Sequence, residues 1–483
     1  MNYKHLTTDF KNIAVAGFLL IFSLFSAQTG LAFSEPDFLG GDSVSERIST
    51  EALEHANVTL EAMKNDPVLR NAEWGFAVYD PNAQKLILSY NEDLPLVPAS
   101  TTKLLTTDTA YSLLGAHFRF DTQMEYSGEI SEEGVLNGNL YIIGSGDPSL
   151  GINHAGAPSY WRMIENFRDI IKNAGIKKIN GNMVIETAIF ENENLLLPPN
   201  IVWKKHNNYY LPVGSTEELD SSKEKLVKKP SDFEKENRFY YISPSKNKPV
   251  YANEFTGKAS LYGKIPPAPA YFAKLFRSSL LKNGISVGSI VTKTIDDQPE
   301  ERQLLTIYKS PLLEDIIYFT NQTSNNRLAE EFMKLSGFYT FGDLSISSGR
   351  SAVEHHLEGV NFDSNGFVYI DGSGLSHSHR VTAIAQVKFL AGMMKRPYFD
   401  SFYQTLPIAG TTGTLKTMFV NNDETGKIIA KTGTLNGVKT LAGYINTSTG
   451  KQLTFSLLIK GYRGTVAQVK KKMEQILEPT IDL

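Results

Sequence analysis

Apolar and polar residues near both ends of the chain follow patterns typical of β-strands. Five segments show this pattern: residues 74–80, 85–90, 428–435, 438–446 and 452–460. A Pro81-Asn82 turn separates the first two segments. Asn436-Gly437, a dipeptide favoured in tight hairpins, separates the third and fourth. We therefore expect the two ends of the chain to meet in one antiparallel sheet.

Other segments carry apolar residues three or four positions apart, as an amphipathic helix does. These segments are residues 99–114, 267–283, 311–319, 327–335 and 466–477. The first begins directly after Pro98, and proline is common where helices start. Helices interspersed with a sheet of this kind predict an α+β domain, in which the helices flank the sheet.

The middle of the chain has a different pattern of short apolar runs and tight turns. Asn137-Gly138 and Asn180-Gly181 predict two further hairpins. Between residues 216 and 238, 13 of 23 residues are charged with mixed sign, which is typical of a solvated loop. We therefore expect a discontinuous catalytic domain split by an insertion of one or two small β-rich domains. The expected bounds are 33–120 and 306–483 for the catalytic domain and 121–305 for the insertion.

The first 32 residues have the features of a secretory signal peptide. Lys4 and Lys11 precede an apolar run from Ile13 to Phe25, and Gly30 and Ala32 supply a small-residue cleavage site. We expect cleavage after residue 32 and export to the periplasm or the cell surface. The alternative is an uncleaved membrane anchor, because residues 13–33 contain no charge.

Composition limits the possible chemistry. Lys and Arg number 48 and Asp and Glu 52, so the net charge of −4 gives no reason to expect a nucleic-acid partner. The absence of cysteine excludes disulfides, thiolate metal sites and a cysteine nucleophile. The nine histidines include no HExxH pair, and the chain has neither a P-loop nor a Gly-x-Ser-x-Gly sequence. We therefore expect no metal and no cofactor.

Three short motifs contain the residues of a lysine-assisted serine nucleophile. Ser100-Thr101-Thr102-Lys103 begins a predicted helix, where a spacing of three places the hydroxyl and the amine on one face. Ser324-Asn325-Asn326 lies between two predicted helices, and Lys431-Thr432-Gly433-Thr434 lies in a predicted strand. Ser-x-x-Lys alone occurs six times in the chain, so the ordered combination carries the signal.

These motifs resemble those of the penicillin-binding proteins and serine β-lactamases. The longer context resembles the class C low-molecular-mass penicillin-binding proteins, the D-alanyl-D-alanine carboxypeptidase/endopeptidase group of peptidase family S13. Four stretches carry it: residues 140–150, 371–382, 406–415 and 430–444. The resemblance implies that family's fold and a serine D-Ala-D-Ala carboxypeptidase. Its partners would be peptidoglycan stem peptides and β-lactam antibiotics, and DD-endopeptidase activity stays open.

The resemblance also implies roles for individual residues in an acyl-transfer reaction. Ser100 would attack the peptide carbonyl, with Lys103 as a neutral general base. Ser324 would pass a proton to the leaving amine, and Asn326 would orient Lys103 or the substrate amide. Lys431 completes the expected catalytic set.

The same resemblance implies a substrate-binding edge on the third motif. Lys431 and Thr432 would hold the terminal carboxylate, and Gly433 would let the substrate backbone approach closely. The backbone N–H groups of Ser100 and Thr434 would form the oxyanion hole.

Four further residues are candidates for substrate binding. Asp147 resembles an insertion-domain aspartate that recognises an amine of the stem peptide, although an ordinary Asp-Pro turn explains it equally well. Arg380, Leu435 and Asn436 would line the same pocket as the third motif.

Rival interpretations keep the same fold. A β-lactamase would share the three motifs but needs a fast deacylation base. The sequence Glu133-x-x-Leu136-Asn137 matches the deacylation motif of class A β-lactamases, but it lies before the second motif instead of after it. A non-catalytic cell-wall-binding protein has no use for both lysines. A biosynthetic transpeptidase would carry a firm anchor and a further N-terminal module. A membrane is an expected partner only if the signal segment stays uncleaved.

Overall fold

The computed structural model describes most of the chain after its first 48 residues. The described residues are 49–152, 156–157, 159–187, 268–293, 300–421 and 424–483, with five short strands between them: β9 (Trp203–Lys205), β10 (Asn208–Leu211), β11 (Phe239–Ile242), β12 (Asn247–Val250) and β13 (Leu261–Gly263). The expected signal segment and the charged segment 216–238 lie outside these residues. Within the described part, no helix combines the length and the apolar character needed to cross a bilayer.

The two ends of the chain form one antiparallel five-stranded sheet, as predicted. Its strands in spatial order are β16 (Ile428–Leu435), β17 (Val438–Asn446), β18 (Gln452–Lys460), β1 (Glu73–Asp80) and β2 (Lys85–Tyr90). Asn436-Gly437 makes the tight turn between the first two strands, and Gly437 has the positive φ of 70° that such turns require. Strand β16, which carries the third motif, lies at the edge of the sheet.

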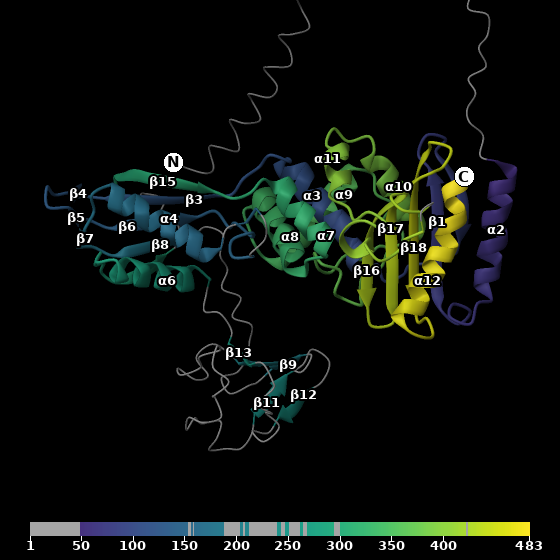
Figure 1. Cartoon of the computed structure of the whole chain (residues 1–483), viewed down its shortest axis with the longest axis horizontal. Helices are drawn as coiled ribbons and strands as arrows, with labels where there is room; N and C mark the ends of the chain where they lie inside the picture. Colours follow the sequence, from purple (N-terminus) through teal and green to yellow (C-terminus); the bar gives the residue numbers. More distant parts are fainter. Residues whose placement is uncertain are drawn as a thin grey trace, which may run out of the picture.

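Helices cover both faces of this sheet (Figure 1). On one face, α2 (Thr50–Lys64), α12 (Val466–Leu477) and the short helix η5 (Glu478–Asp482) pack on a core that includes Phe455 and Leu457. On the other face, α10 (Ala383–Met393) contacts β18 and β1, and Leu458 packs there. Consecutive residues of β18 therefore serve opposite faces, which is the two-residue period of a strand buried on both sides.

A helical layer completes the part of the protein that contains the sheet. It consists of η1 (Ala99–Thr102), α3 (Lys103–Leu114), α7 (Leu313–Thr323), α8 (Asn326–Phe341), α9 (Ile346–Gly359), α11 (Phe399–Gln404) and η4 (Gly413–Leu415). Helix α3 is buried from Lys103 to Tyr111 because α7, α8 and α9 pack around it. The predicted helix at 99–114 therefore begins as a 3₁₀ turn, and the predicted helices at 311–319 and 327–335 meet at Ser324.

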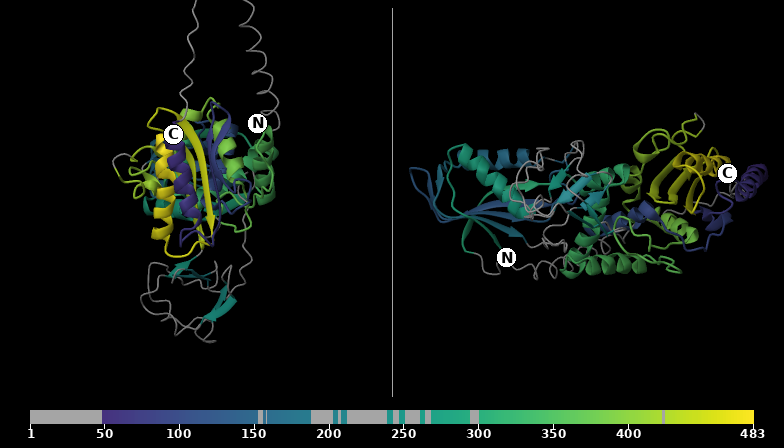
Figure 2. Two further views of the ribbon diagram at one scale, coloured as in Figure 1. Left: turned by 90° about the vertical axis from the view of Figure 1, so that its right-hand side faces the viewer. Right: turned by 90° about the horizontal axis from the view of Figure 1, so that it is seen from below.

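The middle of the chain forms a second five-stranded sheet beside this layer (Figure 2). In spatial order its strands are β14 (Ile290–Lys293), β8 (Met183–Thr187), β6 (Leu140–Gly144), β3 (Asp121–Ser127) and β15 (Arg302–Lys309). Helices α4 (Tyr160–Asn173) and α6 (Ala268–Lys282) share its apolar core, so the expected β-rich insertion also contains helices. Strand β15 pairs with β3 through the expected boundary at 305, and we propose placing that boundary after Lys309.

Both Asn-Gly hairpin predictions in the middle of the chain were wrong. Asn137-Gly138 leads from β5 (Val135–Asn137), in a small sheet with β4 (Glu129–Ile130) and β7 (Lys178–Ile179), to β6 in the large sheet. Asn180-Gly181 likewise leads from β7 to β8, so neither dipeptide joins paired strands. A Cβ at Gly138 would overlap Ser127 O, and one at Gly181 would overlap Gly138 O. These glycines are needed because adjacent connections between the two sheets pass each other in backbone contact.

Candidate active site

Ser100 lies in the 3₁₀ turn η1, where the sheet meets the helical layer. The preceding residue, Ala99, has a φ of +49°, a left-handed conformation that a non-glycine residue adopts only when its surroundings hold it there. Pro98 O provides that restraint, since Thr101 Oγ1 donates to it at 2.8 Å and Thr440 Oγ1 of β17 at 2.6 Å. The turn that presents Ser100 is thus tied directly to the sheet.

Lys103 places its amine among three oxygen atoms in the buried centre of the site. Its Nζ lies 3.0 Å from Ser100 Oγ, 2.7 Å from Asn326 Oδ1 and 2.6 Å from Ser373 O. The side chain is fully buried. Burial lowers the pKa of Lys103 to about 7, although the carboxylates of Glu330 and Asp371 act in the opposite direction. Near neutral pH a substantial fraction of this amine is therefore uncharged and able to accept a proton.

The second lysine, Lys431, contacts the second motif. Its Nζ donates to Ser324 Oγ at 2.9 Å and to Thr432 O at 2.9 Å. Burial, and then the neighbouring amines of Lys103 and Lys439, lower the pKa of Lys431 well below its usual value. An anion that binds next to Lys431 would reverse this effect by favouring the charged form.

The second motif lies at the junction of two helices. Ser324 ends α7 in a left-handed conformation with φ of 55°, and Asn325 caps α8 by accepting a hydrogen bond from Leu328 N at 3.1 Å. Asn326, the first residue of α8, thereby points its amide oxygen at Lys103. Three elements far apart in the sequence, η1, the α7–α8 junction and β16, thus converge on one pair of amines.

Gly433 brings the edge strand β16 into backbone contact with the nucleophile turn. A Cβ at this position would overlap Thr440 Oγ1 and would lie 2.8 Å from Pro98 O and 2.9 Å from Ser100 N. The absence of a Cβ at Gly433 thus makes room for the protein's own turn η1, and the close approach of a substrate backbone to Gly433 stays a prediction.

The backbone of β16 has groups free of the sheet at its outer edge. Ile428 O accepts from Ala409 N at 2.9 Å, and Ala430 N donates to Pro407 O at 3.0 Å, so even-numbered residues turn their polar groups away from β17. Thr432 and Thr434 continue this register beyond the segment that pairs with residues 407–409. Thr432 Oγ1 also donates to Thr414 Oγ1 at 2.7 Å. The N–H group of Thr434 therefore faces outward beside Ser100.

Glu330, which sequence reasoning missed, and the turn at 371–374 position the backbone carbonyl that contacts Lys103. Glu330 accepts hydrogen bonds from Gly372 N at 3.1 Å and from Ser373 N at 3.0 Å, which positions Ser373 O against the Lys103 amine. Asp371 accepts from Leu375 N at 3.0 Å and Ser376 N at 2.8 Å. The Asp-Gly-Ser-Gly sequence at 371–374 is typical of a turn, whereas the sequence sign for Glu330 is its position four residues, one helical turn, after Asn326.

The weaker candidates do not all join this cluster. Arg380 Nη1 donates to His377 O at 2.6 Å and His379 O at 2.7 Å, so its guanidinium is bound to its own loop. Leu435 packs against the apolar group that contains Val97 and Ala99, just before the nucleophile. Asn436 lies exposed in the β16–β17 turn. Leu435 therefore packs beside the nucleophile turn, and the pocket-lining roles of Leu435 and Asn436 stay predictions.

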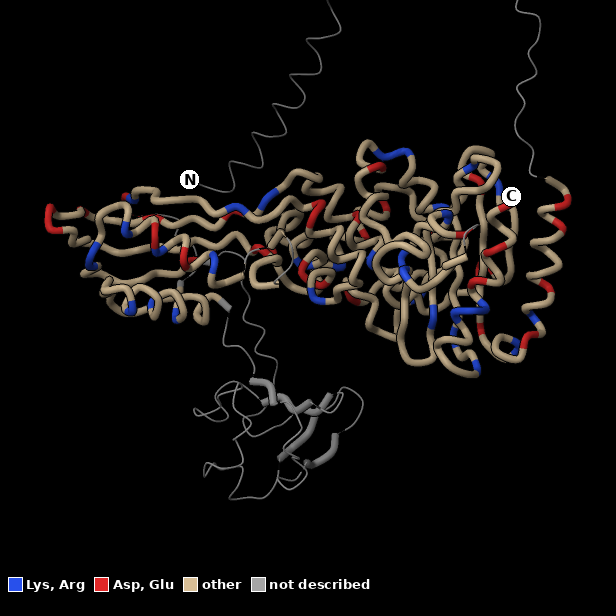
Figure 3. The backbone as a smooth tube through the Cα atoms, viewed as in Figure 1, with Lys and Arg blue, Asp and Glu red and all other residues tan. Residues whose placement is uncertain are grey.

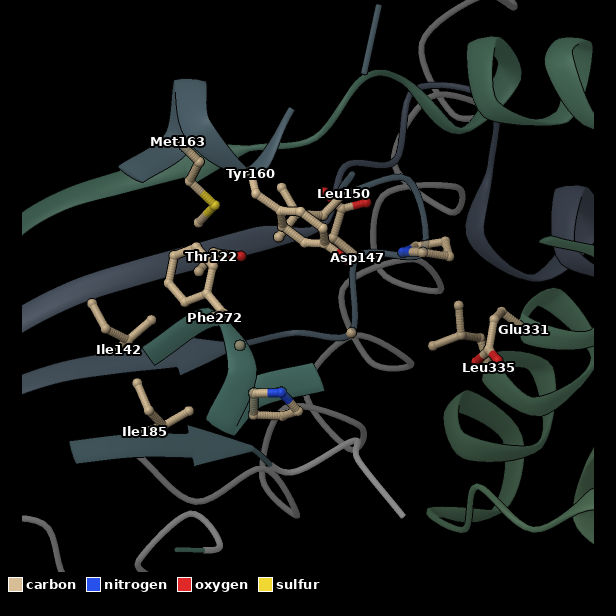
Figure 4. Close-up of a pocket in the computed structure, with 14 residues that line it drawn as sticks. Thr122, Ile142, Asp147, Leu150, Tyr160, Met163, Ile185, Phe272, Glu331 and Leu335 are labelled. Atoms are coloured by element: carbon tan, nitrogen blue, oxygen red, sulfur yellow. The ribbon is translucent and has the colours of Figure 1, made fainter. Parts of the chain in front are cut away.

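Asp147 lies in a separate cavity of about 260 Å³ between the second sheet and α8 (Figure 4). Its Oδ1 accepts from Ser149 N at 2.8 Å and Ser149 Oγ at 2.6 Å, while its Oδ2 is buried without a hydrogen-bond partner in the described part of the chain. Burial raises the pKa of Asp147, and the hydrogen bonds from Ser149 oppose that effect. Glu331 and Leu335 line the cavity from α8, the helix whose first residue contacts Lys103.

Comparison with known proteins identifies one family. The sequence model of the D-Ala-D-Ala carboxypeptidase 3 (S13) family matches residues 56–225 and 259–480. The D-alanyl-D-alanine carboxypeptidase of Actinomadura sp. (strain R39) is 27% identical over 448 residues, which cover 84% of this chain and 81% of that protein. The D-alanyl-D-alanine carboxypeptidase DacB of Haemophilus influenzae is 27% identical over 444 residues, covering 84% and 88%.

A solved structure shows the same fold. It is the crystal structure of penicillin-binding protein 4 (dacB) from Haemophilus influenzae in complex with a β-lactam. It superposes with a TM-score of 0.64 at 21% identity and covers 88% of this chain and 99% of its own. The predicted fold class, an α+β penicillin-binding-protein-like domain with an insertion, is confirmed.

Proposed function

The chain belongs to the D-Ala-D-Ala carboxypeptidase 3 (S13) family, and from this premise we propose that it hydrolyses the terminal D-Ala-D-Ala bond of peptidoglycan stem peptides through an acyl-enzyme on Ser100. Relatives named D-alanyl-D-alanine carboxypeptidases support a serine-type enzyme. The β-lactam in the related crystal structure supports inhibition by penicillin. The observation that carries the residue assignment is the 3.0 Å contact between Lys103 Nζ and Ser100 Oγ.

Acylation begins with a proton transfer within the first motif. In the neutral amine of Lys103, the two N–H bonds are directed to Asn326 Oδ1 and Ser373 O, and the lone pair is left facing Ser100 Oγ. Lys103 takes the Ser100 proton as the oxygen attacks the carbonyl carbon. The N–H groups of Ser100 and Thr434 then stabilise the oxyanion. Ser100 N is available because the first N–H groups of a helical turn have no partner within it.

The leaving amine receives its proton from Ser324 in this proposal. When the substrate carboxylate binds beside Thr432, Lys431 is stabilised as an ammonium ion, which can only donate hydrogen bonds. Ser324 Oγ then accepts from Lys431 and gives its own proton to the amine as the C–N bond breaks. The proton that Lys103 took from Ser100 replaces it, so Lys103 is neutral again before the ester is hydrolysed. Water next attacks the ester, giving the shortened peptide and free Ser100. When a β-lactam ring opens, the amine stays bonded to the acyl group instead of leaving the site as a separate product. The ester on Ser100 therefore persists.

The proposal is tested by intact-mass measurement after brief incubation with benzylpenicillin. We expect one persistent adduct per chain, and fragmentation of the tryptic peptide 86–103 should place it on Ser100. The same preparation should release D-alanine from a stem pentapeptide. Rapid penicillin hydrolysis without an adduct would indicate a β-lactamase. The absence of adduct, penicillin hydrolysis and peptide cleavage would leave a cell-wall-binding protein.

The pH dependence of acylation follows from the pKa of Lys103. Because the general base must be neutral and its pKa is about 7, the acylation rate constant should rise with pH and level off above about 7. Below that value it should fall about tenfold per pH unit. The measurement is the rate of adduct formation between pH 5 and 9, and a pH-independent rate would contradict Lys103 as the base.

Replacing Glu330 with glutamine should shift this profile. The Glu330 carboxylate raises the pKa of Lys103, so Glu330→Gln should move the rising limb to lower pH, while the amide oxygen can keep one of the two backbone hydrogen bonds. At pH 6 the acylation rate constant of Glu330→Gln should be a larger fraction of its own high-pH plateau than that of the wild type. Glu354→Gln, an exposed residue on α9, is the matched control and should leave the limb in place. An unshifted limb in Glu330→Gln would exclude this electrostatic role.

Asp147 is proposed to recognise a cationic amine of the stem peptide. Its Oδ2 has no hydrogen-bond partner in the described part of the chain, and Asp147 lines a cavity with mainly apolar walls. An ammonium ion bound there would supply the missing hydrogen bond. Asp147→Asn should lower kcat/KM about tenfold for a stem peptide with a free side-chain amine. It should have little effect on the N-acetylated peptide or on acylation by benzylpenicillin. Equal losses on both peptides would assign Asp147 to turn structure instead.

We also propose that the protein acts outside the cytoplasm, after cleavage of residues 1–32. Stem peptides of peptidoglycan lie there, and the charged residues of the described fold mix both signs (Figure 3), as on an ordinary solvated surface. N-terminal sequencing of the exported protein tests the cleavage. The balance between carboxypeptidase and endopeptidase action is tested by adding a cross-linked muropeptide to the cleavage assay.

A further inference from the structure

Lys439 is a buried lysine at the substrate edge that the mechanism above does not use. It lies on β17 directly opposite Thr434 of β16, and its Nζ donates a hydrogen bond to Thr434 Oγ1. Lys439 is only 4% exposed, whereas Thr434 is exposed at the edge. The Lys439 amine is thus buried next to β16, and it contacts the exposed edge of that strand through the Thr434 hydroxyl group.

The hydrogen bond determines where the proton of Thr434 can point. An ammonium group has three donors and no acceptor, so Thr434 Oγ1 must be the acceptor in this pair. Its own proton is therefore turned away from Lys439 and is available to an incoming acceptor at the exposed edge. Thr434 follows Lys431 and Thr432, the residues proposed to hold the terminal carboxylate. The acceptor expected at the Thr434 hydroxyl is therefore an oxygen of the substrate's carboxylate.

The charge of Lys439 is not balanced by an acidic partner. In the described part of the chain no carboxylate forms an ion pair with it, and the charged group that acts on it is another amine, Lys470 of α12. Burial, and then Lys470, lower the pKa of Lys439 to about 8, so it is still mostly charged at neutral pH. A buried cation without a counter-ion is costly in the free protein, and an arriving anion removes part of that cost.

We propose that Lys439 is a specificity-determining residue that selects leaving groups ending in a free carboxylate, by polarising the Thr434 hydroxyl and adding positive charge at the β16 edge. The inference rests on the proposed carboxypeptidase function and deepens it. Lys439 does not touch the reacting atoms; it acts through Thr434. It favours a carboxylate-terminated peptide over the same peptide ending in a carboxamide, because an amide carries no negative charge.

The test compares two peptides that differ only in this group. For Lys439→Met, kcat/KM on a D-Ala-D-Ala peptide should fall about tenfold to a hundredfold, mainly through KM. On the matching D-Ala-D-alaninamide peptide it should stay within about twofold. Lys439→Arg, which keeps the charge, should recover part of the discrimination. Lys470→Met removes the neighbouring amine of α12 and should leave the ratio of the two peptides nearly unchanged.

A second variant keeps the test decisive if Lys439→Met folds poorly. Thr434→Val removes the hydroxyl but keeps the backbone N–H. It should lower the ratio of kcat/KM on the D-Ala-D-Ala peptide to kcat/KM on the D-Ala-D-alaninamide peptide. The double variant should lower this ratio little further, because both changes interrupt the same interaction between Lys439, Thr434 and the substrate's carboxylate. If folded Lys439→Met or Thr434→Val loses activity equally on both peptides, the inference is overturned. If the wild type forms no penicillin adduct and cleaves neither peptide, the proposed function itself fails.

Discussion

Replacing Ser100 with alanine is expected to abolish penicillin adduct formation and to reduce D-Ala release by at least about a thousandfold. The hydroxyl supplies the atom that forms the ester, and nothing else in the cluster around Lys103 can replace it. Ser324 Oγ lies against Lys431 instead, on the leaving-group side. The readouts are intact mass after incubation with benzylpenicillin and D-alanine released from a stem pentapeptide.

The fold should survive this substitution. Ser100 is partly exposed, and within the described ranges its hydroxyl forms one hydrogen bond, with the Lys103 amine. The turn η1 is held by Pro98 O through Thr101 and Thr440. The melting temperature of Ser100→Ala should therefore stay close to that of the wild type. Ser89→Ala, in the same tryptic peptide but on β2, is the matched control and should acylate normally. An adduct on Ser100→Ala would remove this serine as the nucleophile.

Replacing Gly433 with alanine is expected to cause a second large loss, through geometry instead of chemistry. The new methyl group would overlap Thr440 Oγ1 and press on Pro98 O and Ser100 N, which would lie 2.8 and 2.9 Å away. Two of these three atoms are backbone, so β16 must move away from η1. That movement separates the Ser100 and Thr434 N–H groups, and losing an oxyanion donor lowers the rate about a hundredfold to a thousandfold. Stopped-flow acylation and thermal melting measure the two effects.

Suitable controls separate crowding from the general effect of a methyl group. Gly392→Ala, near the end of α10, meets no heavy atom within 4 Å and should be neutral or slightly stabilising, because alanine favours helix. Combining Gly433→Ala with Thr440→Ser should recover little activity, since the clash with the backbone of Pro98 and Ser100 remains. Normal acylation by Gly433→Ala would show that β16 and η1 need not be in such close contact.

The elements whose evidence is local were predictable from the sequence. The five strands at the chain ends and the helix around 466–477 were confirmed nearly to the residue, because period-two and helical patterns record which face each segment buries. The spacing of Ser100 and Lys103 is also local, since a turn of helix brings residues three apart together. The two Asn-Gly dipeptides at 137–138 and 180–181 failed as hairpins, because the turn before a strand does not determine which strand it pairs with.

By itself, then, the sequence determined most of the strands and helices, the nucleophile–base spacing and the three motifs that carry the family resemblance. Only the tertiary structure decided how the Lys103 amine is oriented. Its partners Asn326 and Ser373 lie 223 and 270 residues away, and the Ser373 contact is a backbone carbonyl that any residue type would offer. The roles of Glu330, Gly433 and Lys439 were also invisible, because burial and close approach arise only when distant segments pack together. Chain pattern encodes local conformation, whereas the pKa and position of a catalytic group depend on everything folded around it.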